Sequence, residues 1–559
     1  MSKPWLKVWP ESVPESIQYP EVPLYELLTR TATTYPKNVA MIFFGNRITY
    51  EELSVHTDNF AAALSKQGVK KGDRVALFLP NVPEFVIAYY GAMKCGGIVT
   101  AVNPASKERD LVCQVNDAEA VALVTLDTTY SLVENVWDRT TVKHVIVARI
   151  QDFMPRGTSF GGLSNSSSTK ILSHSLTQSP NVHSFNELIK FGNDHSPNLK
   201  LSPKVDVAVL QYTDGTTGIP RGVMLTHYNL VSNAIMFAEW LMAMTGSEVF
   251  LTALPFCDVY SMTTSMNDAI FLASSMVLMP RYDSKAALES IERNRVTVFC
   301  GSPTTYDMLM QRPDVGKYDL SSVKFCISGE APLNVEVQRR YMKVAGCVLV
   351  EGYGLTECSP ITHCNPSDKS MKTFKVGSVG IPLPDTEAKI VEFRTGKEAK
   401  VGKVGELLIR GPQVMKGYWN LPEETDVVLR DGWLYTGDIG KMDDDGYFFI
   451  LDRKTDLIRY KGYIIYPREL EDVLLEHPAI RDVAVVGKAD EIAGEIPKAF
   501  VTLKEDATAS EEELIDFVKK RVAAYKYIRE IEFKKELPKT LLGRTLRREL
   551  AKEETERSL

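Results

Sequence analysis

Hydrophobic and polar residues alternate between two spacings along the first 150 residues. Residues 50–69, YEELSVHTDNFAAALSKQGV, place apolar side chains at the three-and-four spacing of an amphipathic helix, whereas residues 73–80, DRVALFLP, are a short apolar run typical of a buried strand. Residues 84–104 continue with a helical pattern, a glycine break and another strand. Strands separated by helices predict parallel βαβ units and hence an α/β fold.

The same alternation returns after residue 205. The apolar run DVAVLQYT (206–213) predicts a strand, HYNLVSNAIMFAEWLMAM (227–244) a helix, and further strand-like runs end near residues 303, 330 and 354. Residues 376–450 turn to short, turn-rich β segments, and the chain after Asp452 is compact and mixed. We therefore expect an N-terminal domain over 1–451 and a C-terminal domain over 452–559, with residues 156–184, rich in Ser, Gly and Asn, as an exposed insertion.

Composition narrows the class of protein. The 559 residues carry a formal net charge of -7, which argues against nucleic acid as a partner because phosphate binding needs a concentrated basic face. The eight Cys residues include no CxxC pair, so we expect reduced and mostly buried thiols, and the cluster Cys358, His363 and Cys364 lacks the second ligand pair of a zinc site.

The sequence also carries no strong targeting signal. Its first residues, MSKPWLKVWPESVPES, resemble no secretory signal, and no window reaches the ~18 uninterrupted apolar residues that a spanning helix needs. The final RSL differs from the peroxisomal SKL tripeptide. These features predict a cytoplasmic protein, and they leave peripheral contact with a membrane surface open.

Residues 211–227, QYTDGTTGIPRGVMLTH, have the composition of a phosphate-binding loop. Thr213, Thr216 and Thr217 offer hydroxyl donors, the intervening glycines permit close backbone approach, and Arg221 adds a positive charge. We expect the loop to join the preceding strand to the following helix, so that the helix N-terminus also faces the anion. A Walker loop is excluded because no G-K-[ST] follows at the required spacing.

Two further stretches carry candidate chemistry. In VEGYGLTECSP (350–360), the glycines would let a flat ring lie against the backbone, and Thr356 and Glu357 offer oxygen ligands for Mg²⁺. In residues 432–471, Asp438 lies in a glycine turn and Arg453 follows a strand, so both could hydrogen-bond the hydroxyls of a ribose. Each stretch alone is also compatible with an ordinary solvated turn.

Taken together, the order and separation of these three stretches resemble the adenylate-forming superfamily of acyl-CoA synthetases, luciferases and peptide-synthetase adenylation domains. The resemblance covers about residues 25–550 and is strongest to the long-chain fatty acid–CoA ligases, through WPESVPESIQYPEVPLYELL near the start and NPASKERDLVCQVNDAEA after residue 102. It implies a large N-terminal domain of two stacked α/β sheets and a small β-barrel, followed by a small mobile α+β C-terminal domain. It also implies two half-reactions, in which ATP and a carboxylate give an acyl-adenylate and pyrophosphate, and coenzyme A then displaces AMP.

The resemblance assigns roles to residues by position. The residues expected to bind ATP are Thr213, Asp214, Gly215, Thr216, Thr217, Gly218, Arg221, Gly329, Glu330, Ala331, Glu351, Gly352, Tyr353, Gly354, Asp438 and Arg453. Thr356, Glu357 and Arg544 would act in catalysis, with Thr216 and Glu357 near Mg²⁺, and Asp452 would be the hinge. The acyl chain would lie beside Trp240, Asp258, Met262 and Ser302, and Lys461, Gly462 and Tyr463 would face coenzyme A.

Several positions depart from the family pattern. Arg544 occupies the place of the catalytic Lys, and Arg keeps the charge but is planar and larger, which suits it less to sit as a point donor between two oxygens. Arg221 and Arg459 replace other lysines, and Asp258 replaces a usual His. Asp214 brings a carboxylate into the phosphate loop; at ~5 Å from a phosphate charge the repulsion costs about 3 kcal/mol at an effective dielectric of about 20.

The leading hypothesis is an ATP-dependent fatty acid–CoA ligase that uses Mg²⁺ and coenzyme A. One alternative is a relative that binds nucleotide or acyl-adenylate without efficient adenylation, which Asp214, Asp258 and Arg544 favour. Another is a ligase for a short, aryl or hydroxylated acid. The sequence leaves the acyl-chain length open, and the family precedent allows a monomer or a homodimer.

Overall fold

The computed structural model describes residues 3–155, 179–190, 199–213, 221–366, 373–540 and 543–558. Two compact units account for the chain: unit 1 comprises residues 1–7, 388–409 and 435–559, and unit 2 comprises residues 8–387 and 410–434. The predicted boundary at residues 451 and 452 falls within unit 1, inside strand β22 (Phe448–Arg453), and stays a prediction.

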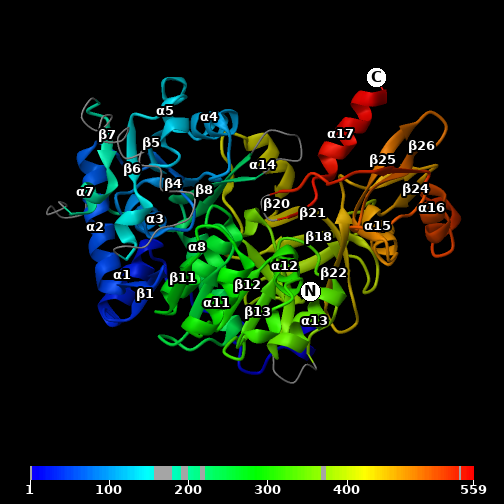
Figure 1. Cartoon of the computed structure of the whole chain (residues 1–559), viewed down its shortest axis with the longest axis horizontal. Coiled ribbons are helices and arrows are strands. Elements are labelled where there is room, and N and C mark those ends of the chain that lie inside the picture. Colours follow the sequence, from blue (N-terminus) through cyan, green and yellow to red (C-terminus); the bar gives the residue numbers. More distant parts are fainter. Residues whose placement is uncertain are drawn as a thin grey trace. The chain divides into compact units, whose positions relative to one another are not determined.

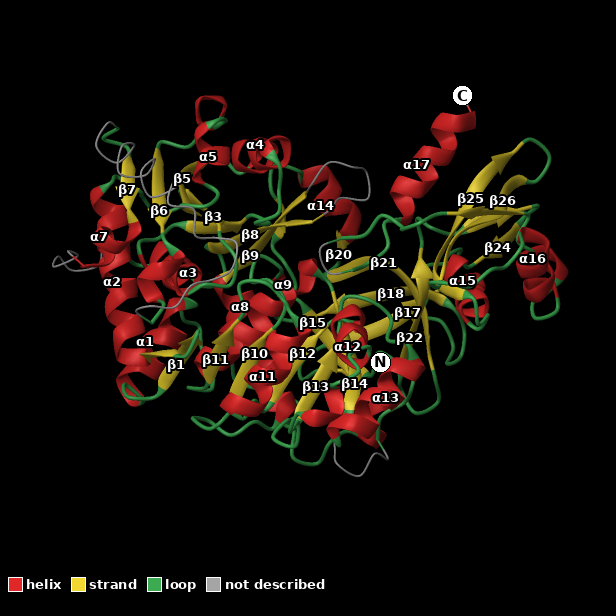
Figure 2. Ribbon diagram, viewed as in Figure 1, coloured by secondary structure: helices red, strands yellow, loops and turns green. Residues whose placement is uncertain are grey.

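Unit 2 contains two large sheets, and the predicted α/β class is confirmed. Among the described residues, nine strands form the first sheet in the order β16-β15-β14-β13-β12-β10-β11-β1-β2. Figure 2 shows its parallel strands from β1 through β11, β10, β12 and β13 to β14. Their bounds are β1 (Val39–Phe43), β2 (Asn46–Thr49), β10 (Val249–Thr252), β11 (Ser275–Leu278), β12 (Val298–Gly301), β13 (Phe325–Ser328), β14 (Leu349–Gly354), β15 (Ile361–Cys364) and β16 (Ile381–Pro382). Its central strands from β1 to β14 pair in parallel, as apolar runs separated by helices predict.

The second sheet has the order β19-β9-β8-β4-β3-β5-β6-β7 among the described residues. Its strands are β3 (Arg74–Phe78), β4 (Ile98–Ala101), β5 (Ala120–Leu126), β6 (His144–Ala148), β7 (Val182–Ser184), β8 (Val207–Thr213), β9 (Arg221–Thr226) and β19 (Gly417–Tyr418). Residues 156–178 of the predicted insertion lie outside the described residues, and its last three residues form β7.

Helices form the layers around these sheets. α3 (Pro83–Lys94) is buried from Pro83 to Met93 and packs on β3 and β4. The largely buried α8 (His227–Leu241) packs on β8 and β9 and against α10 (Asp268–Phe271), which contacts β11 of the first sheet. A helix that is apolar around most of its circumference belongs between two layers, so these helices separate the sheets. On the first sheet, α11 (Ser284–Asn294), α12 (Pro303–Met310) and α13 (Val335–Ala345) lie beside one another (Figure 1).

Local sequence explains where several helices begin. The predicted helix over 50–69 is α2 (Tyr50–Lys66), which begins at a capping box formed by Thr49 and Glu52. α8 begins at a second such box, in which Thr226 and Asn229 satisfy each other's backbone N–H groups. The start of α1 (Tyr25–Thr34) is linked to the start of α8, since the Leu24 N–H donates to His227 Nδ1 at 3.1 Å. Burial lowers the pKa of His227 to about 4, so its ring is a neutral acceptor.

Two smaller sheets lie mainly in unit 1. Strands β17 (Glu387–Val391), β18 (Gly405–Arg410), β21 (Trp433–Met442) and β22 belong to the turn-rich β region that the sequence predicts. The remaining sheet has β24 (Tyr463–Ile465), β23 (Ile458–Tyr460), β26 (Gly494–Leu503), β25 (Ile480–Asp490) and β27 (Glu530–Phe533), covered by α15 (Pro467–Leu475), α16 (Glu511–Lys519) and α17 (Arg547–Ser558).

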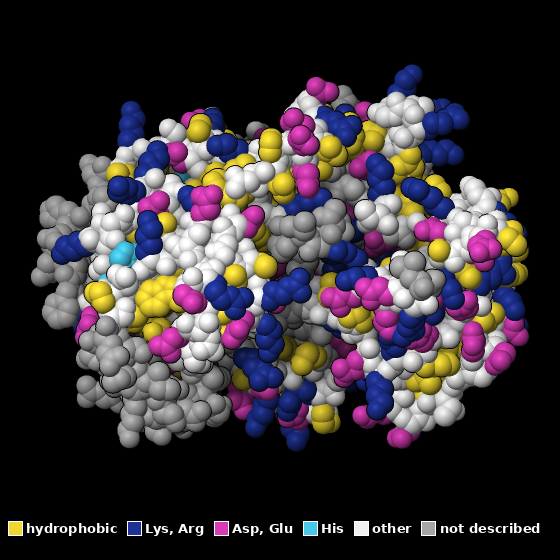
Figure 3. Space-filling view, turned by 90° about the horizontal axis from the view of Figure 1, so that it is seen from above, with side chains coloured by type: hydrophobic (Ala, Val, Ile, Leu, Met, Phe, Trp, Pro, Cys, Tyr) yellow, Lys and Arg dark blue, Asp and Glu magenta, His cyan; other side chains and the backbone are white. Residues whose placement is uncertain are grey.

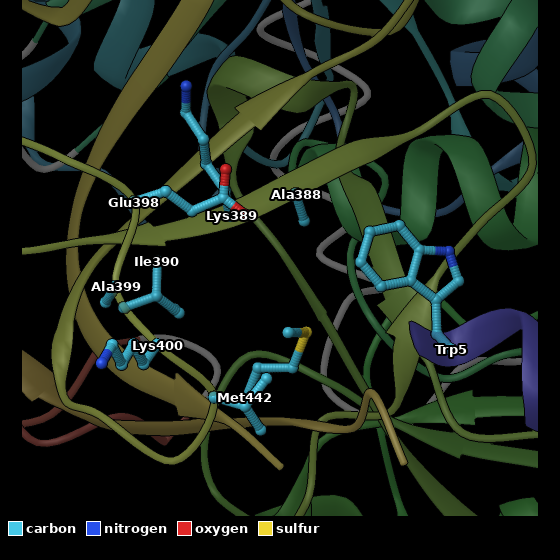
Figure 4. Close-up of a pocket in the computed structure, with 9 residues that line it drawn as sticks. Trp5, Ala388, Lys389, Ile390, Glu398, Ala399, Lys400 and Met442 are labelled. Atoms are coloured by element: carbon cyan, nitrogen blue, oxygen red, sulfur yellow. The ribbon is translucent and has the colours of Figure 1, made fainter. Parts of the chain in front are cut away.

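Trp5 anchors the start of the chain within unit 1. Its side chain is 2% exposed and its ring centroid lies 6.0 Å from that of Phe448. Figure 4 shows the indole beside a small hollow lined by Ile390, Ala399 and Met442. Position 446 requires glycine, because a Cβ there would lie 2.2 Å from the backbone nitrogen of Trp5.

The remaining global features concern membranes, thiols and charge. No helix among the described residues is long and apolar enough to cross a bilayer. All eight cysteines are described, and seven of them are buried, as predicted. On the face seen in Figure 3, Lys and Arg side chains are interspersed with Asp and Glu.

Candidate active site

The predicted phosphate loop connects two strands. β8 ends at Thr213 and β9 begins at Arg221, and these two residues are cross-strand partners at the base of an antiparallel hairpin. Five residues of the predicted ATP set, listed here together, lie outside the described residues: Asp214, Gly215, Thr216, Thr217 and Gly218. The expectation of a direct strand-to-helix connection is wrong, because RGVMLT pairs with β8 and delays the start of α8 to His227.

Arg221 belongs to a chain of polar contacts. Its Nε lies 2.6 Å from Glu424 Oε2, and its guanidinium carbon lies 5.4 Å from the centre of the Tyr418 ring. The Tyr418 hydroxyl donates to Glu357 Oε1 at 2.8 Å. Burial and the neighbouring Glu357 carboxylate raise the pKa of Tyr418, so the phenol stays protonated and donates. A cation, a phenol and a carboxylate therefore lie side by side next to the end of the phosphate loop.

Sequence reasoning missed Tyr418 and Glu424. Tyr418 reaches Glu357 because β19 pairs with β9, placing Tyr418 opposite Val223. The backbone N–H of Met415 also donates to the Glu357 carbonyl at 2.8 Å. The sequence offered only the tripeptide Gly-Tyr-Trp at 417–419 as a local signal. The hydrogen-bond partner of Tyr418, Glu357, lies 61 residues away along the chain.

Thr356 and Glu357 form a single 3-10 turn directly after β14. Glu351 is buried within β14, and Gly352, Tyr353 and Gly354 pair with β15. A Cβ on Gly354 would lie 2.2 Å from the Pro360 carbonyl oxygen, so only glycine permits this approach of the two strands. The glycines predicted to border adenine therefore also shape the turn that holds Glu357.

The second predicted adenine segment follows the neighbouring strand. β13 and β14 are parallel, so Gly329, Glu330 and Ala331 leave the same edge of the sheet as the end of β14. Glu330 has a left-handed φ of 71°, and a Cβ on Gly329 would lie 2.9 Å from the Tyr260 ring. The structure thus brings the two predicted adenine segments together.

The predicted acyl-pocket residues come from α8, from the π-helix that packs against it, and from loops that follow strands β10 and β12 of the first sheet. Trp240 lies near the end of α8, and its ring contacts Trp9 edge-on at 5.5 Å between centroids. Met262 is buried at the first position of a π-helix, η4 (Met262–Asn267), which packs against α8. Single π-turns are frequent at functional sites.

Asp258 and Ser302 have capping contacts in the structure. The Asp258 carboxylate accepts from the Tyr260 N–H at 2.7 Å, and Ser302 caps α12 in a box with Thr305. Asn81, which sequence reasoning missed, accepts from the Phe256 N–H at 2.7 Å and donates to the carbonyls of Thr252 and Leu254. It fixes the loop that precedes Asp258.

In unit 1, the two predicted ribose ligands are cross-strand partners. Asp438 in β21 lies opposite Arg453 in β22, and Arg453 Nε lies 3.2 Å from Asp438 Oδ1. The predicted hinge residue Asp452 is next to Arg453 and is buried. Asp438 and Arg453 are 15 residues apart in the sequence, and the antiparallel pairing of β21 with β22 brings them together.

The predicted coenzyme A residues form the exposed tip of another hairpin. Lys461 and Gly462 have left-handed φ values of 47° and 81° in the turn between β23 and β24. Tyr463 is 55% exposed and stacks on Tyr525 with ring centroids 4.6 Å apart.

Arg544 lies at the surface in a tight turn before α17. Its N–H donates to Thr540 Oγ1 at 3.1 Å, and its carbonyl accepts from the Thr540 N–H at 2.8 Å. Leu546 N–H donates to the Pro538 carbonyl at 2.8 Å and closes the turn.

Comparison with known proteins identifies the family. A profile described as "AMP-binding enzyme" matches residues 28–419, and one described as "AMP-binding enzyme C-terminal domain" matches residues 469–544. The long-chain-fatty-acid–CoA ligase of Bacillus subtilis (strain 168) is 43% identical over 99% of this chain and 98% of its own length. The ligase of that name from Escherichia coli O157:H7 is 36% identical, covering 99% of this chain and 98% of its own length.

Solved structures agree with these sequences. The crystal structure of ATP-bound MatB from Rhodopseudomonas palustris has a TM-score of 0.81 at 27% identity, covering 95% of this chain and 99% of that one. A fatty acyl CoA synthetase of Mycobacterium tuberculosis has a TM-score of 0.73 at 26% identity, covering 96% of this chain and 99% of that one. The match to both profiles and the full-length similarity confirm the predicted resemblance, and the chain belongs to the family of AMP-binding enzymes.

Proposed function

We propose that the protein is an ATP-dependent fatty acid–CoA ligase that works through an acyl-adenylate. The observation that carries this proposal is the contact chain from Arg221 through Tyr418 to Glu357, which places a cation and a carboxylate at the end of the phosphate loop. Phosphoryl and nucleotidyl transfer rely on positioning and on charges held ready for the reacting phosphates. The long-chain-fatty-acid–CoA ligases that are 36–43% identical support fatty acids as the substrate class.

The reaction has two balanced steps. A carboxylate oxygen of the fatty acid attacks the α-phosphorus of ATP, the bond to the bridging oxygen breaks, and pyrophosphate leaves. The thiolate of coenzyme A then attacks the acyl carbonyl, and AMP leaves as the thioester forms. In the first step, Arg221 neutralises phosphate charge, and Arg544 offers its cation to the charge that builds between carboxylate and α-phosphate.

The nucleoside portion of ATP is assigned to two groups of residues. Asp438 and Arg453 bind the ribose hydroxyls, and residues 329–331 and 351–354 border adenine. Thr356 adds a hydroxyl donor toward the α-phosphate. The pairing of Asp438 with Arg453 supports the first assignment because it presents a carboxylate acceptor and a guanidinium donor together.

Glu357 suits the Mg²⁺ that accompanies ATP. Its carboxylate supplies the hard oxygen ligands that Mg²⁺ prefers, and Tyr418 orients it by donating to Oε1. When bound, Mg²⁺ would neutralise phosphate charge. Glu357 would hold it from the protein side, with Thr216 as the second residue that the family resemblance assigns.

The remaining assignments concern the acid and coenzyme A. Trp240, Asp258, Met262 and Ser302 line the acyl chain, and residues 461–463 face coenzyme A. The exposure of Tyr463 at a hairpin tip supports the second assignment. Asp452 serves as the hinge between the two steps. Oligomeric state and peripheral membrane contact stay predictions.

Carboxylate-dependent exchange of labelled pyrophosphate into ATP tests the proposal, because it isolates adenylation from the coenzyme A step. We expect exchange with Mg²⁺ and long-chain acids, and a loss of about 100-fold in Glu357→Gln. Acids from acetate to oleate, with 4-coumarate as the aryl acid, identify the substrate class. Exchange with 4-coumarate alone would replace fatty acids by aryl acids, for which a 34% identical 4-coumarate–CoA ligase of Nicotiana tabacum is the precedent.

A second candidate is a relative that binds nucleotide without efficient adenylation. Arg544 at the position of the catalytic lysine favours it, since a guanidinium is less able to act as a point donor. Folded protein that binds ATP but exchanges pyrophosphate with no acid would establish this candidate and end the ligase proposal.

A further inference from the structure

Arg547, the first residue of α17, gathers three carboxylates around one guanidinium. Its Nη1 donates to Asp452 Oδ1 at 2.8 Å and to Asp456 Oδ2 at 3.2 Å. Its Nε donates to Glu471 Oε1 at 2.8 Å, and Nη2 donates to the other oxygen of the same carboxylate. The Arg547 side chain is 21% exposed, and that of Asp452 only 1%.

The carboxylates in this cluster also bind backbone N–H groups. Asp452 accepts from the N–H of Arg453 and of Arg468, each at 2.9 Å. Glu471 accepts from the Val485 N–H at 2.8 Å. The cluster therefore joins the end of β22, the start of α15, the middle of β25 and the start of α17. Bidentate, charge-assisted contacts of this kind are directional as well as strong.

The two ends of the cluster adjoin two residues of the proposed ATP site. Asp452 immediately precedes Arg453, the proposed ribose ligand, and Arg547 follows Arg544 by three residues. The chain between Arg544 and Arg547 is short, and the turn before it is closed by the Leu546–Pro538 hydrogen bond. Moving Arg547 relative to Asp452 would move Arg544 relative to Arg453.

We propose that Arg547 is a positioning residue for adenylation, which sets the separation of the segments that carry Arg453 and Arg544. This inference rests on the proposed function, which gives both residues a role toward ATP. Arg547 itself touches carboxylates of the protein. A guanidinium suits the task because its planar fork binds Glu471 with two parallel donors while Nη1 reaches Asp452, an arrangement that a lysine ammonium cannot reproduce.

The competing explanation is that Arg547 only stabilises the fold by anchoring α17. A second ionic contact of α17 provides a matched control for this explanation. Lys498 in β26 is 6% exposed and donates to Glu554 of α17 at 2.5 Å, and it also lies 3.0 Å from Glu532. Lys498→Gln thus removes a buried ionic anchor of the same helix, seven residues beyond Arg547, without touching Asp452 or the Arg544 turn.

The test compares Arg547→Gln, Arg547→Lys and Lys498→Gln in the full-length protein. Urea unfolding measures the loss of stability of each, pyrophosphate exchange measures adenylation, and thioester formation from synthetic palmitoyl-adenylate measures the second step. In Arg547→Gln we expect kcat for exchange to fall about 10- to 100-fold, with KM for ATP and acid nearly unchanged. Thioester formation should fall far less, because Arg544 is assigned to adenylation, and Arg547→Lys should recover part of the exchange.

Lys498→Gln should lose stability comparably and keep exchange within about threefold of wild type. Equal losses of exchange in Arg547→Gln and Lys498→Gln, equal losses in both half-reactions, or unchanged exchange in Arg547→Gln would each overturn the inference. Failure of the wild type to exchange with any acid is a separate result: it refutes the proposed function and with it the step that Arg547 would serve.

Discussion

Tyr418 lies between Arg221, at the end of the predicted phosphate loop, and Glu357, the proposed catalytic carboxylate. It is buried, its hydroxyl donates to Glu357, and its ring faces Arg221. Removing the hydroxyl takes this donor away from Glu357 but keeps the ring in place. We expect Tyr418→Phe to lower pyrophosphate exchange about tenfold, equivalent to about 1.4 kcal/mol.

Tyr282→Phe is the control for this substitution, because the Tyr282 hydroxyl also donates to a protein acceptor, the Thr305 carbonyl at 3.0 Å. It should change exchange by less than about twofold. Equal rates of pyrophosphate exchange in wild type and Tyr418→Phe would show that the hydrogen bond from the phenol to Glu357 is not required for adenylation.

A substitution at Arg544 tests whether the proposed adenylation site is adapted to arginine or impaired by it. It keeps the positive charge of the family's lysine on a larger, planar group. If the site has adapted to arginine, Arg544→Lys changes exchange little or lowers it; if arginine is a defect, exchange rises. We expect a change of less than about fivefold, measured with saturating ATP and palmitate. A gain of about 100-fold would instead support the candidate with impaired adenylation.

At the scale of elements, α3 carries a buried acid in its first turn. Glu84 is fully buried, and burial raises its pKa from 4.5 to about 8. The folded state therefore holds a proton that the unfolded chain releases near pH 4.5. The stability associated with the neutral carboxyl is fully present below that pH and is lost as pH rises through about 8.

Glu84→Gln should accordingly flatten the dependence of unfolding free energy on pH between pH 5 and 9. At pH 9 we expect the variant to be more stable than wild type by roughly 2 kcal/mol. Urea unfolding at several pH values measures this, with the exposed Glu336 in the first turn of α13 changed to Gln as the control. Parallel pH profiles of wild type and Glu84→Gln would contradict the expectation.

The β14–β15 pair depends on the absence of a side chain at Gly354. A methyl group there would lie 2.2 Å from the Pro360 carbonyl oxygen, so Gly354→Ala must push the strands apart. We expect a loss of about 1–3 kcal/mol in unfolding free energy and a fall in exchange, since Thr356 and Glu357 follow directly. Gly316→Ala, where a methyl group meets nothing within 4 Å, should do neither.

At the scale of the whole molecule, nucleotide binding should stabilise the folded chain independently of catalysis. A ligand at a hundredfold its Kd adds about 2.7 kcal/mol to the unfolding free energy. We expect AMP to raise the Tm of the wild type, and Asp438→Asn to reduce that increase by weakening ribose binding. An equal Tm increase in both proteins would remove Asp438 from the ribose assignment.

Local patterns predicted the elements that bury a continuous face. The runs before Thr213 and Gly354 are strands β8 and β14, and the helical spacing over 50–69 is α2. β9 was missed because its six residues lie between a glycine-rich loop and a helix cap, where a short apolar segment has no distinctive period. Its antiparallel pairing with β8 is a property of the folded chain that this short segment does not reveal.

The residues of the candidate site likewise fall into those that local sequence predicted and those that only the folded chain revealed. The resemblance of three stretches predicted roles for Glu357, Asp438 and Arg453, because glycine turns and charged residues at set positions can be seen in the sequence alone. Tyr418, Glu424, Asn81 and Arg547 were missed, because each acts through a partner distant in the chain, such as Asp452, 95 residues from Arg547.

The sequence by itself thus determined the α/β class and the family, and it predicted the residues that we propose carry charge toward ATP. Local hydrophobic periodicity and short motifs record those properties directly. Only the tertiary structure decided which side chains orient those residues, because the pairing of β19 with β9 and the docking of α17 beside β22 depend on how distant segments bury their surfaces together.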